Sequence, residues 1–207
     1  MHKTVAIKLV GGCSDTSKMP GLSYGLPTAN CITGEKLSKL AGSVCSKCYA
    51  KRGFYHTFAC SVVPAQQRRL ASLDDPQWVE AMVTILHREQ WFRWFDSGDL
   101  QSVQMLRNIC EVARRTPHCK HWLATRERVF VSRYLTESVI PDNLVVRVSA
   151  TFPDVPVKPI KGVNMANVHS KKPAVGQACP APQQNGKCDT CRACWDKSVL
   201  TISYKEH

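Results

Sequence analysis

The sequence has no long hydrophobic run. A helix that spans a bilayer needs about 20 consecutive apolar residues, and no stretch of the 207 residues approaches that length. Residues 1–10 are interrupted by Lys8 and are too short for the apolar core of a secretory signal peptide. We therefore expect a cytoplasmic protein with no membrane partner.

Acidic residues are scarce as well. The chain contains 16 Asp and Glu against 28 Lys and Arg, which gives a formal net charge of +12. Because the basic residues are spread along the whole chain, the charge indicates a solvated surface and acidic partners, and supports nucleic-acid binding only weakly. Hydrophobic residues make up 43% of the chain, enough to bury a core, which excludes a disordered polybasic tail.

The cysteine content does not fit a complete disulfide framework. The chain has 11 cysteines, an odd number that cannot be fully paired. In addition, thiols in the cytosol stay reduced, so disulfides are rare there. Metal binding is therefore the leading explanation for the cysteines.

A regular alternation of helices and strands is predicted from about residue 74. Dense apolar and β-branched residues predict strands at residues 91–95, 120–124, 143–149 and 162–168. Apolar residues at helical spacing predict helices at residues 76–86, 102–115 and 131–139. Such βα repetition implies parallel strands, so we predict an α/β fold, a partial (half) βα barrel with a C-terminal cysteine-rich metal-binding segment.

The length suits a single domain, residues 1–207, which we divide into three parts. Residues 1–73 are expected to be loop-rich, because residues 11–34 are dense in Gly, Ser, Pro and Thr. Residues 74–170 carry the βα repeats, and residues 171–207 form a cysteine-rich tail that binds a cluster.

Polar residues follow each predicted strand, where ligands gather in parallel α/β folds. Asp96 and Asp99 are candidates for acid–base catalysis, and Arg126 is a candidate anion clamp. The alternative is simple turn chemistry, in which Asp99 caps the next helix. The complete set of polar strand-end residues is Asp96, Ser97, Asp99, Thr125, Arg126, Glu127, Ser149, Thr151, Asn167 and His169.

The strongest metal-binding pattern lies near the C-terminus. Cys188, Cys191 and Cys194 have two residues between neighbours, a spacing that can wrap one corner of an iron–sulfur cluster. Cys179, which precedes a proline, could supply a fourth thiolate. We therefore predict a [4Fe–4S] cluster at these four residues. A zinc site is the alternative, and thiols without a metal are the least favoured interpretation.

A second group lies nearer the N-terminus: Cys31, and the pair Cys45 and Cys48. These three could form a second metal site, contribute to the C-terminal site, or, in the case of the pair, act in redox chemistry. Cys110 lies on the apolar face of a predicted helix, so we interpret it as a small core residue, and interpret Cys60 and Cys119 in the same way.

Three segments together resemble a phage-encoded family of small, cysteine-rich proteins. They are Cys45-x₂-Cys48-Tyr49-Ala50 with Gly53 and Tyr55, then Phe92-Arg93-x₂-Asp96-Ser97-Gly98-Asp99, and Cys188-x₂-Cys191-x₂-Cys194-Trp195. That family is in turn similar to radical S-adenosylmethionine proteins, which implies a shortened βα barrel, iron–sulfur ligation and a host-cytoplasmic setting. The resemblance spans roughly residues 27–200. However, the C-x₃-C-x₂-C spacing of the radical enzymes is absent from the chain.

These observations give three hypotheses for function. The first is a phage-type iron–sulfur protein that acts in redox chemistry or modulates a host protein, with an unknown host or redox partner. The second is a radical-type or other enzyme at the strand-end edge. The third is a zinc-containing module that binds nucleic acid. The sequence alone does not decide whether the protein is an enzyme.

Overall fold

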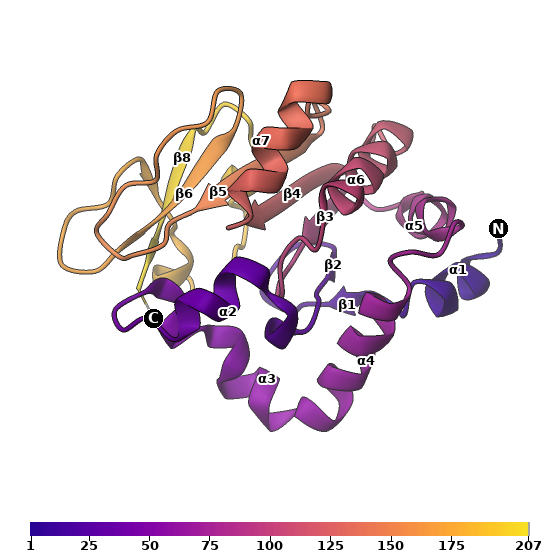
Figure 1. The fold of residues 1–207 in the computed structure, drawn as a ribbon, viewed down its shortest axis with the longest axis horizontal. Helices are drawn as coiled ribbons and strands as arrows, with labels where there is room; N and C mark the ends of the chain where they lie inside the picture. Colours follow the sequence, from indigo (N-terminus) through magenta and orange to yellow (C-terminus); the bar gives the residue numbers. More distant parts are fainter. Residues whose placement is uncertain (207) are drawn as a thin grey trace.

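A single open sheet of eight strands organises the chain (Figure 1). The structure, a computed structural model, describes residues 1–206, and for residues 53 and 54 the backbone alone. The strands are ordered β1-β2-β3-β4-β5-β6-β8-β7, and every neighbouring pair is parallel except β1 with β2. They are β1 Ser14–Asp15, β2 Leu22–Tyr24, β3 Trp91–Trp94, β4 Lys120–Thr125, β5 Leu144–Ser149, β6 Asn164–His169, β7 Gln177–Ala178 and β8 Thr201–Lys205.

Helices connect the strands and cover one face of the sheet. The α-helices are α1 Lys3–Leu9, α2 Ile32–Ser38, α3 Gly53–Thr57, α4 Ala59–Ala71, α5 Trp78–Leu86, α6 Val103–Arg115 and α7 Arg128–Glu137. Short 3₁₀ helices are η1 Thr28–Asn30, η2 Val44–Lys47, η3 Tyr49–Lys51, η4 Ala181–Gln183 and η5 Ala193–Trp195. Within residues 1–206, no helix is both long and apolar enough to cross a membrane.

The two faces of the sheet carry different cores, because successive side chains of a strand point to opposite sides. Phe92, Trp94 and Leu123 belong to the larger core, which includes apolar residues of α1, α5, α6 and α7. Trp122 and Ile202 belong to a smaller core on the other face, which includes Cys194 and Trp195 of the C-terminal segment. The cysteine-rich segment therefore packs on the face that the helices leave open.

The α/β prediction is confirmed, and each element predicted between residues 74 and 170 is present within a few residues of its expected bounds. The sheet is not closed. The loop-rich interpretation of residues 1–73 is wrong, because this part contains four α-helices and strands β1 and β2. Residues 171–207 likewise supply strands β7 and β8, and β8 lies between β6 and β7.

The glycines that suggested a loop before β2 have a tertiary reason. Gly21 has a φ of +71°, and a Cβ at this position would lie 2.0 Å from the carbonyl oxygen of Trp91 in β3. Only glycine allows the chain to approach β3 so closely with this backbone conformation. The glycine content that predicts a loop before β2 therefore reflects the close packing of this segment on β3.

His121 gives the helix-covered core a sensitivity to acid. Its side chain is fully buried, stacks on Trp94 with ring centroids 6.1 Å apart, and has Nε2 2.9 Å from the hydroxyl of Thr116. Burial, with a smaller effect of His118, lowers the pKa of His121 from 6.5 to about 3. The folded protein therefore holds this imidazole neutral.

We predict that His121 destabilises the protein as the pH falls below 6.5. Between pH 6.5 and about 3 the unfolded chain binds a proton that the folded state excludes, so the free energy of unfolding falls by up to about 1.4 kcal/mol per pH unit. His121→Gln should remove this part of the pH dependence. Urea unfolding of both proteins between pH 7 and 4 measures it, and equal slopes would contradict the prediction.

Candidate functional site

The end of β3 turns sharply to present two carboxylates. Phe95, the residue after β3, has a φ of +61°, which is uncommon for a residue other than glycine. Gly98 has a φ of +73°, and a Cβ there would lie 2.7 Å from the carbonyl oxygen of Leu26. Asp96 lies between these two positions and Asp99 directly follows the second. Each of the two residues is only 5% exposed. Strained backbone at a strand end is typical of functional sites.

Asp99 joins the ends of β3 and β4. Its carboxylate accepts hydrogen bonds from the Thr125 hydroxyl and, at 2.8 Å each, from the backbone N–H groups of Leu100 and Arg126. Burial raises the pKa of Asp99 to about 6, against the lowering effect of these bonds. Asp99 does not cap α6, because the capping side chain is that of Ser102. Its carboxyl group can therefore exchange a proton close to neutral pH.

Asp96 is held by two tyrosines. The Tyr55 hydroxyl donates to Asp96 Oδ2 at 2.7 Å, and the Tyr49 hydroxyl donates to the Asp96 backbone carbonyl. The other carboxylate oxygen, Oδ1, is buried and has no hydrogen-bond partner among the residues that the structure describes. A Cβ on Gly25 would lie 2.5 Å from this oxygen, so the carboxylate packs directly on the backbone that follows β2.

The N-terminal cysteine segment is attached to the strand ends by three contacts. Glu127 accepts from the backbone N–H and hydroxyl of Thr33 at 2.7 and 2.8 Å, which places a carboxylate at the N-terminus of α2. Val44 N–H donates to the Thr151 carbonyl at 2.9 Å, beyond β5. Tyr49, immediately after Cys48, makes the third contact, to Asp96.

These contacts bring Cys31, Cys45 and Cys48 together beside the strand ends. A Cβ on Gly34 would lie 3.6 Å from Cys31 Sγ and 3.7 Å from Cys45 Sγ, so both sulfur atoms flank one glycine. Burial raises the pKa of Cys31 to about 12; Asp99, Cys48 and Cys45 raise it further, while Arg126 lowers it. Burial also raises the pKa of Cys45, opposed by Arg126. The three cysteines therefore share one region with Asp99 and Arg126.

Only part of the predicted strand-end set joins this region. Arg126 lies beside the end of β5, where its Nε donates to the Ala150 carbonyl at 3.2 Å. Asn167 and His169, at the end of β6, instead line a separate small cavity with Asp154. His169 Nδ1 is 2.9 Å from the Ser203 hydroxyl, and Asn167 accepts from Val157 N–H. The expectation that the fourth strand end contributes to the site is therefore not met.

The C-terminal cysteines form a second group, on the face of the sheet that lacks helices. Cys194 is buried with Trp122 and Trp195, and Cys179 packs against the same cluster. Burial raises the pKa of Cys188, and the neighbouring Cys179 and Cys191 raise it further, which indicates that these thiols lie close together. The Cys194 sulfur is 3.2 Å from the Tyr204 hydroxyl of β8.

Arg147 of β5 holds this segment on the sheet. Its side chain is fully buried, and its guanidinium donates to five backbone carbonyls. Four of these belong to the cysteine-rich segment; the five acceptors are Cys194 at 3.2 Å, Val199 at 2.8 Å, Ala193 and Asp196 at 2.9 Å, and Met165 at 3.4 Å. Every N–H group of the guanidinium is thus used to fix the path of the chain around Cys194.

Arg93 of β3 lies between the two cysteine groups. Its guanidinium donates to the Tyr49 hydroxyl at 3.1 Å, next to Cys48, and lies 4.5 Å over the Trp122 ring. It also opposes the pKa increase that burial causes at Cys188 and Cys194. Within residues 1–206, neither Arg93 nor Arg147 forms an ion pair with a carboxylate.

The donor chemistry of the C-terminal group fits a thiolate-bound metal cluster. Arg147 is buried and Arg93 half-buried, both without a paired carboxylate, and metal-bound thiolates would supply a negative charge beside them. Within residues 1–206, no three or more His, Cys, Asp or Glu side chains are arranged as ligands of a single metal ion.

Sequence reasoning missed Arg93 and Arg147 as parts of these sites. Each is an arginine inside an otherwise apolar strand, Trp91–Trp94 and Leu144–Ser149, and that pattern is the signal that could have identified them. Of the cysteines interpreted as core residues, Cys110 and Cys119 are fully buried, but Cys60 is exposed, so that interpretation is wrong for Cys60.

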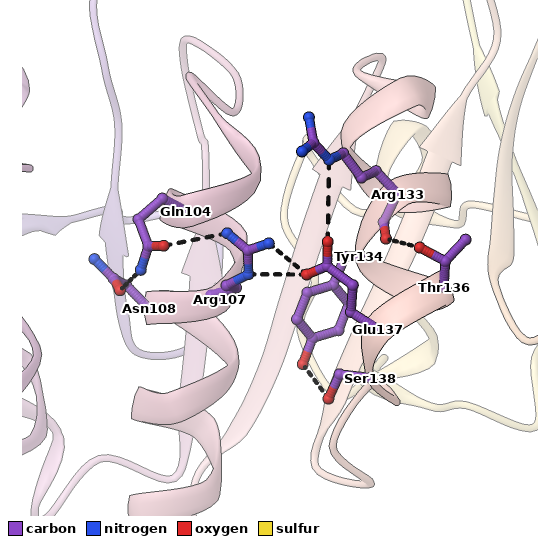
Figure 2. A network of polar contacts seen from close by, with 8 residues as sticks. All are labelled: Gln104, Arg107, Asn108, Arg133, Tyr134, Thr136, Glu137 and Ser138. Atoms are coloured by element: carbon purple, nitrogen blue, oxygen red, sulfur yellow. Dashed lines mark hydrogen bonds and ion pairs between the residues drawn. The ribbon is translucent and has the colours of Figure 1, made fainter.

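A cavity of about 400 Å³ on the helix-covered side is a weaker candidate, because its charged groups satisfy one another (Figure 2). Arg107 of α6 bonds to Glu137 of α7 and to Gln104, which in turn donates to Asn108. Arg133 pairs with the same Glu137 at 4.0 Å. No cysteine and no strand-end residue lines this cavity.

Comparison with known proteins gives one family. The family model described as Gene product 88 (GP88) matches residues 2–197 of the chain. The searches of curated proteins and of solved structures found no match.

We predict that Arg147→Met destabilises the protein by about 3–5 kcal/mol, because it leaves buried carbonyls without donors. Arg107→Met, which removes an exposed ion pair on α6, is the control and should change stability little. Urea unfolding gives the loss, and amide exchange at residues 193–199 should accelerate in Arg147→Met alone. Equal effects of the two substitutions would contradict the prediction.

Proposed function

The chain belongs to the Gene product 88 family of phage proteins, and we propose that it is an iron–sulfur protein with a [4Fe–4S] cluster. Cys179, Cys188, Cys191 and Cys194 would supply the thiolates. The observation that carries the proposal is the gathering of these four thiols on one sheet face beside Arg93 and Arg147.

Charge balance favours this ligand set. Metal binding replaces protonated thiols by thiolates, and a cluster with four thiolate ligands is a net anion. The guanidinium groups of Arg93 and Arg147 already lie beside the Cys194 thiol and oppose the effect of burial on its pKa. A bound cluster would therefore turn two unpaired cations, buried Arg147 and half-buried Arg93, into stabilising neighbours.

Such a cluster supplies one-electron redox chemistry. The protein around it fixes the ligands through Arg147 and controls access of water through Trp122, Trp195 and Tyr204. With a net charge of +12, the chain suits an acidic redox partner or an acidic host protein. Electron transfer or modulation of that partner would be the biological role.

Substitution of one ligand tests this proposal. We predict that Cys191→Ser loses most of the iron and sulfide and the brown colour of the anaerobically purified protein, and unfolds more easily. Cys60→Ser, at an exposed cysteine outside both groups, is the matched control and should keep its cluster.

Two results would overturn the proposal. Full iron content in Cys191→Ser would show that other residues hold the metal. A colourless wild-type protein with one zinc ion per chain would favour the zinc module, and salt-sensitive retention of nucleic acid would then support its binding role.

A second candidate function, an enzyme at the strand-end edge, is favoured by the position of the N-terminal cysteines. Cys31, Cys45 and Cys48 lie together beside Asp99 and Arg126. Three thiolates on a four-iron cluster leave one iron available to a non-protein ligand, such as the amino and carboxylate groups of S-adenosylmethionine. Asp99 would serve as acid–base and Arg126 as anion clamp, on a sheet whose consecutive parallel strands fit a partial βα barrel.

Product analysis tests the enzyme. We predict that the protein converts S-adenosylmethionine to methionine and 5′-deoxyadenosine. Dithionite would supply the one electron that breaks the carbon–sulfur bond, and a C–H group of the substrate or, in its absence, of the buffer would supply the hydrogen atom that completes 5′-deoxyadenosine. Cys45→Ser should reduce the product by about 100-fold, because loss of a cysteine ligand disrupts the cluster, while Cys60→Ser should not. Absence of 5′-deoxyadenosine and an unchanged cluster EPR signal on addition of S-adenosylmethionine would exclude this candidate.

A further inference from the structure

Within residues 1–206, two neighbouring side chains on the open face of the sheet carry buried N–H groups with no acceptor. They are Trp122 Nε1 of β4 and Arg93 Nε of β3, and the two residues are register partners across the strands. Buried donors without a partner are rare in native proteins, and each calls for an explanation such as a bound group.

Both donors lie among the C-terminal cysteines. Trp122 is 5% exposed and belongs to the apolar cluster that contains Cys194 and Cys179. The Arg93 guanidinium lies over the Trp122 ring and, through its charge, opposes the effect of burial on Cys188 and Cys194. The rest of the Arg93 guanidinium is already engaged, by Tyr49 and by the Met19 sulfur at 3.1 Å each. The unpartnered Arg93 Nε and Trp122 Nε1 therefore lie on the sheet face that carries the thiols.

We propose that Trp122 and Arg93 are positioning residues whose free N–H groups donate to the sulfur atoms of the C-terminal cluster and raise its reduction potential. This inference rests on the proposed function. Reduction adds negative charge that is shared by the cluster sulfurs, so a donor to sulfur stabilises the reduced state more than the oxidised one.

The chain contains a matched control for this role. Trp94 Nε1 is also buried without an acceptor, but Trp94 lies in the helix-covered core between Tyr24, Trp78 and Phe92. Successive residues of β3 point to opposite faces, so Trp94 lies on the other side of the sheet from Arg93. Removing its N–H therefore tests the loss of a buried indole donor away from the cysteines.

The experiment is an EPR-monitored redox titration of the iron-loaded protein and its variants. We predict that Trp122→Phe lowers the equilibrium constant for one-electron reduction about tenfold, or about 59 mV, with unchanged iron content. Trp94→Phe should leave the potential unchanged. Arg93→Gln should also lower the potential, by more than Trp122→Phe, because it removes a positive charge together with the donor.

A direct readout keeps the inference testable if Trp122→Phe fails to load iron. In protein that carries ¹⁵N-tryptophan at position 122 alone, pulsed EPR of the reduced cluster should show coupling to the indole nitrogen. Absence of that coupling, or an unchanged potential in iron-replete Trp122→Phe, would overturn the proposal. Absence of any cluster in the wild-type protein would instead overturn the proposed function, and this inference with it.

Discussion

The guanidinium of Arg147 is the interaction on which the C-terminal half of the structure depends. It is fully buried in the centre of β5 and uses all of its donors on backbone carbonyls, four of them in the cysteine-rich segment. Burial of Cys194 and Trp195 in the smaller core adds to these bonds. A single charged side chain therefore fixes an irregular loop on a sheet, and sets where the thiol of Cys194 and the ring of Trp195 lie.

The strand-end edge is built on a different principle, with many short polar contacts in place of one clamp. Asp99 links β3 to β4, Glu127 links β4 to α2, and Tyr49 links the segment after Cys48 back to Asp96. Each contact satisfies a backbone group that would otherwise be left buried and unpaired at the end of an element. The result is a region where carboxylates, thiols and an arginine from distant parts of the chain meet.

The residue pattern within single elements was sufficient to predict the strands and helices of the middle part of the chain. Alternating or continuous apolar runs identified β3 to β6, and helical spacing identified α5, α6 and α7, because periodicity reflects which face of an element is buried. Strand β2 escaped, since its three residues between Gly21 and Gly25 carry too little pattern, and β8 escaped because it lies in the cysteine-rich tail; both strands are held by pairing with strands distant in sequence. The same limit applied to Asn167 and His169, whose position at a strand end did not determine which cavity they line.

The sequence by itself determined the α/β class, the spacing of the C-terminal thiols and the candidacy of Asp96, Asp99 and Arg126, because each depends on residues close together in the chain. Only the tertiary structure decided that Cys31 joins Cys45 and Cys48 beside Asp99, and that Arg93 and Arg147 lie next to the C-terminal cysteines. Those neighbours come from strands and loops far apart in sequence. Their contacts are determined by strand order and register, which residue spacing does not encode.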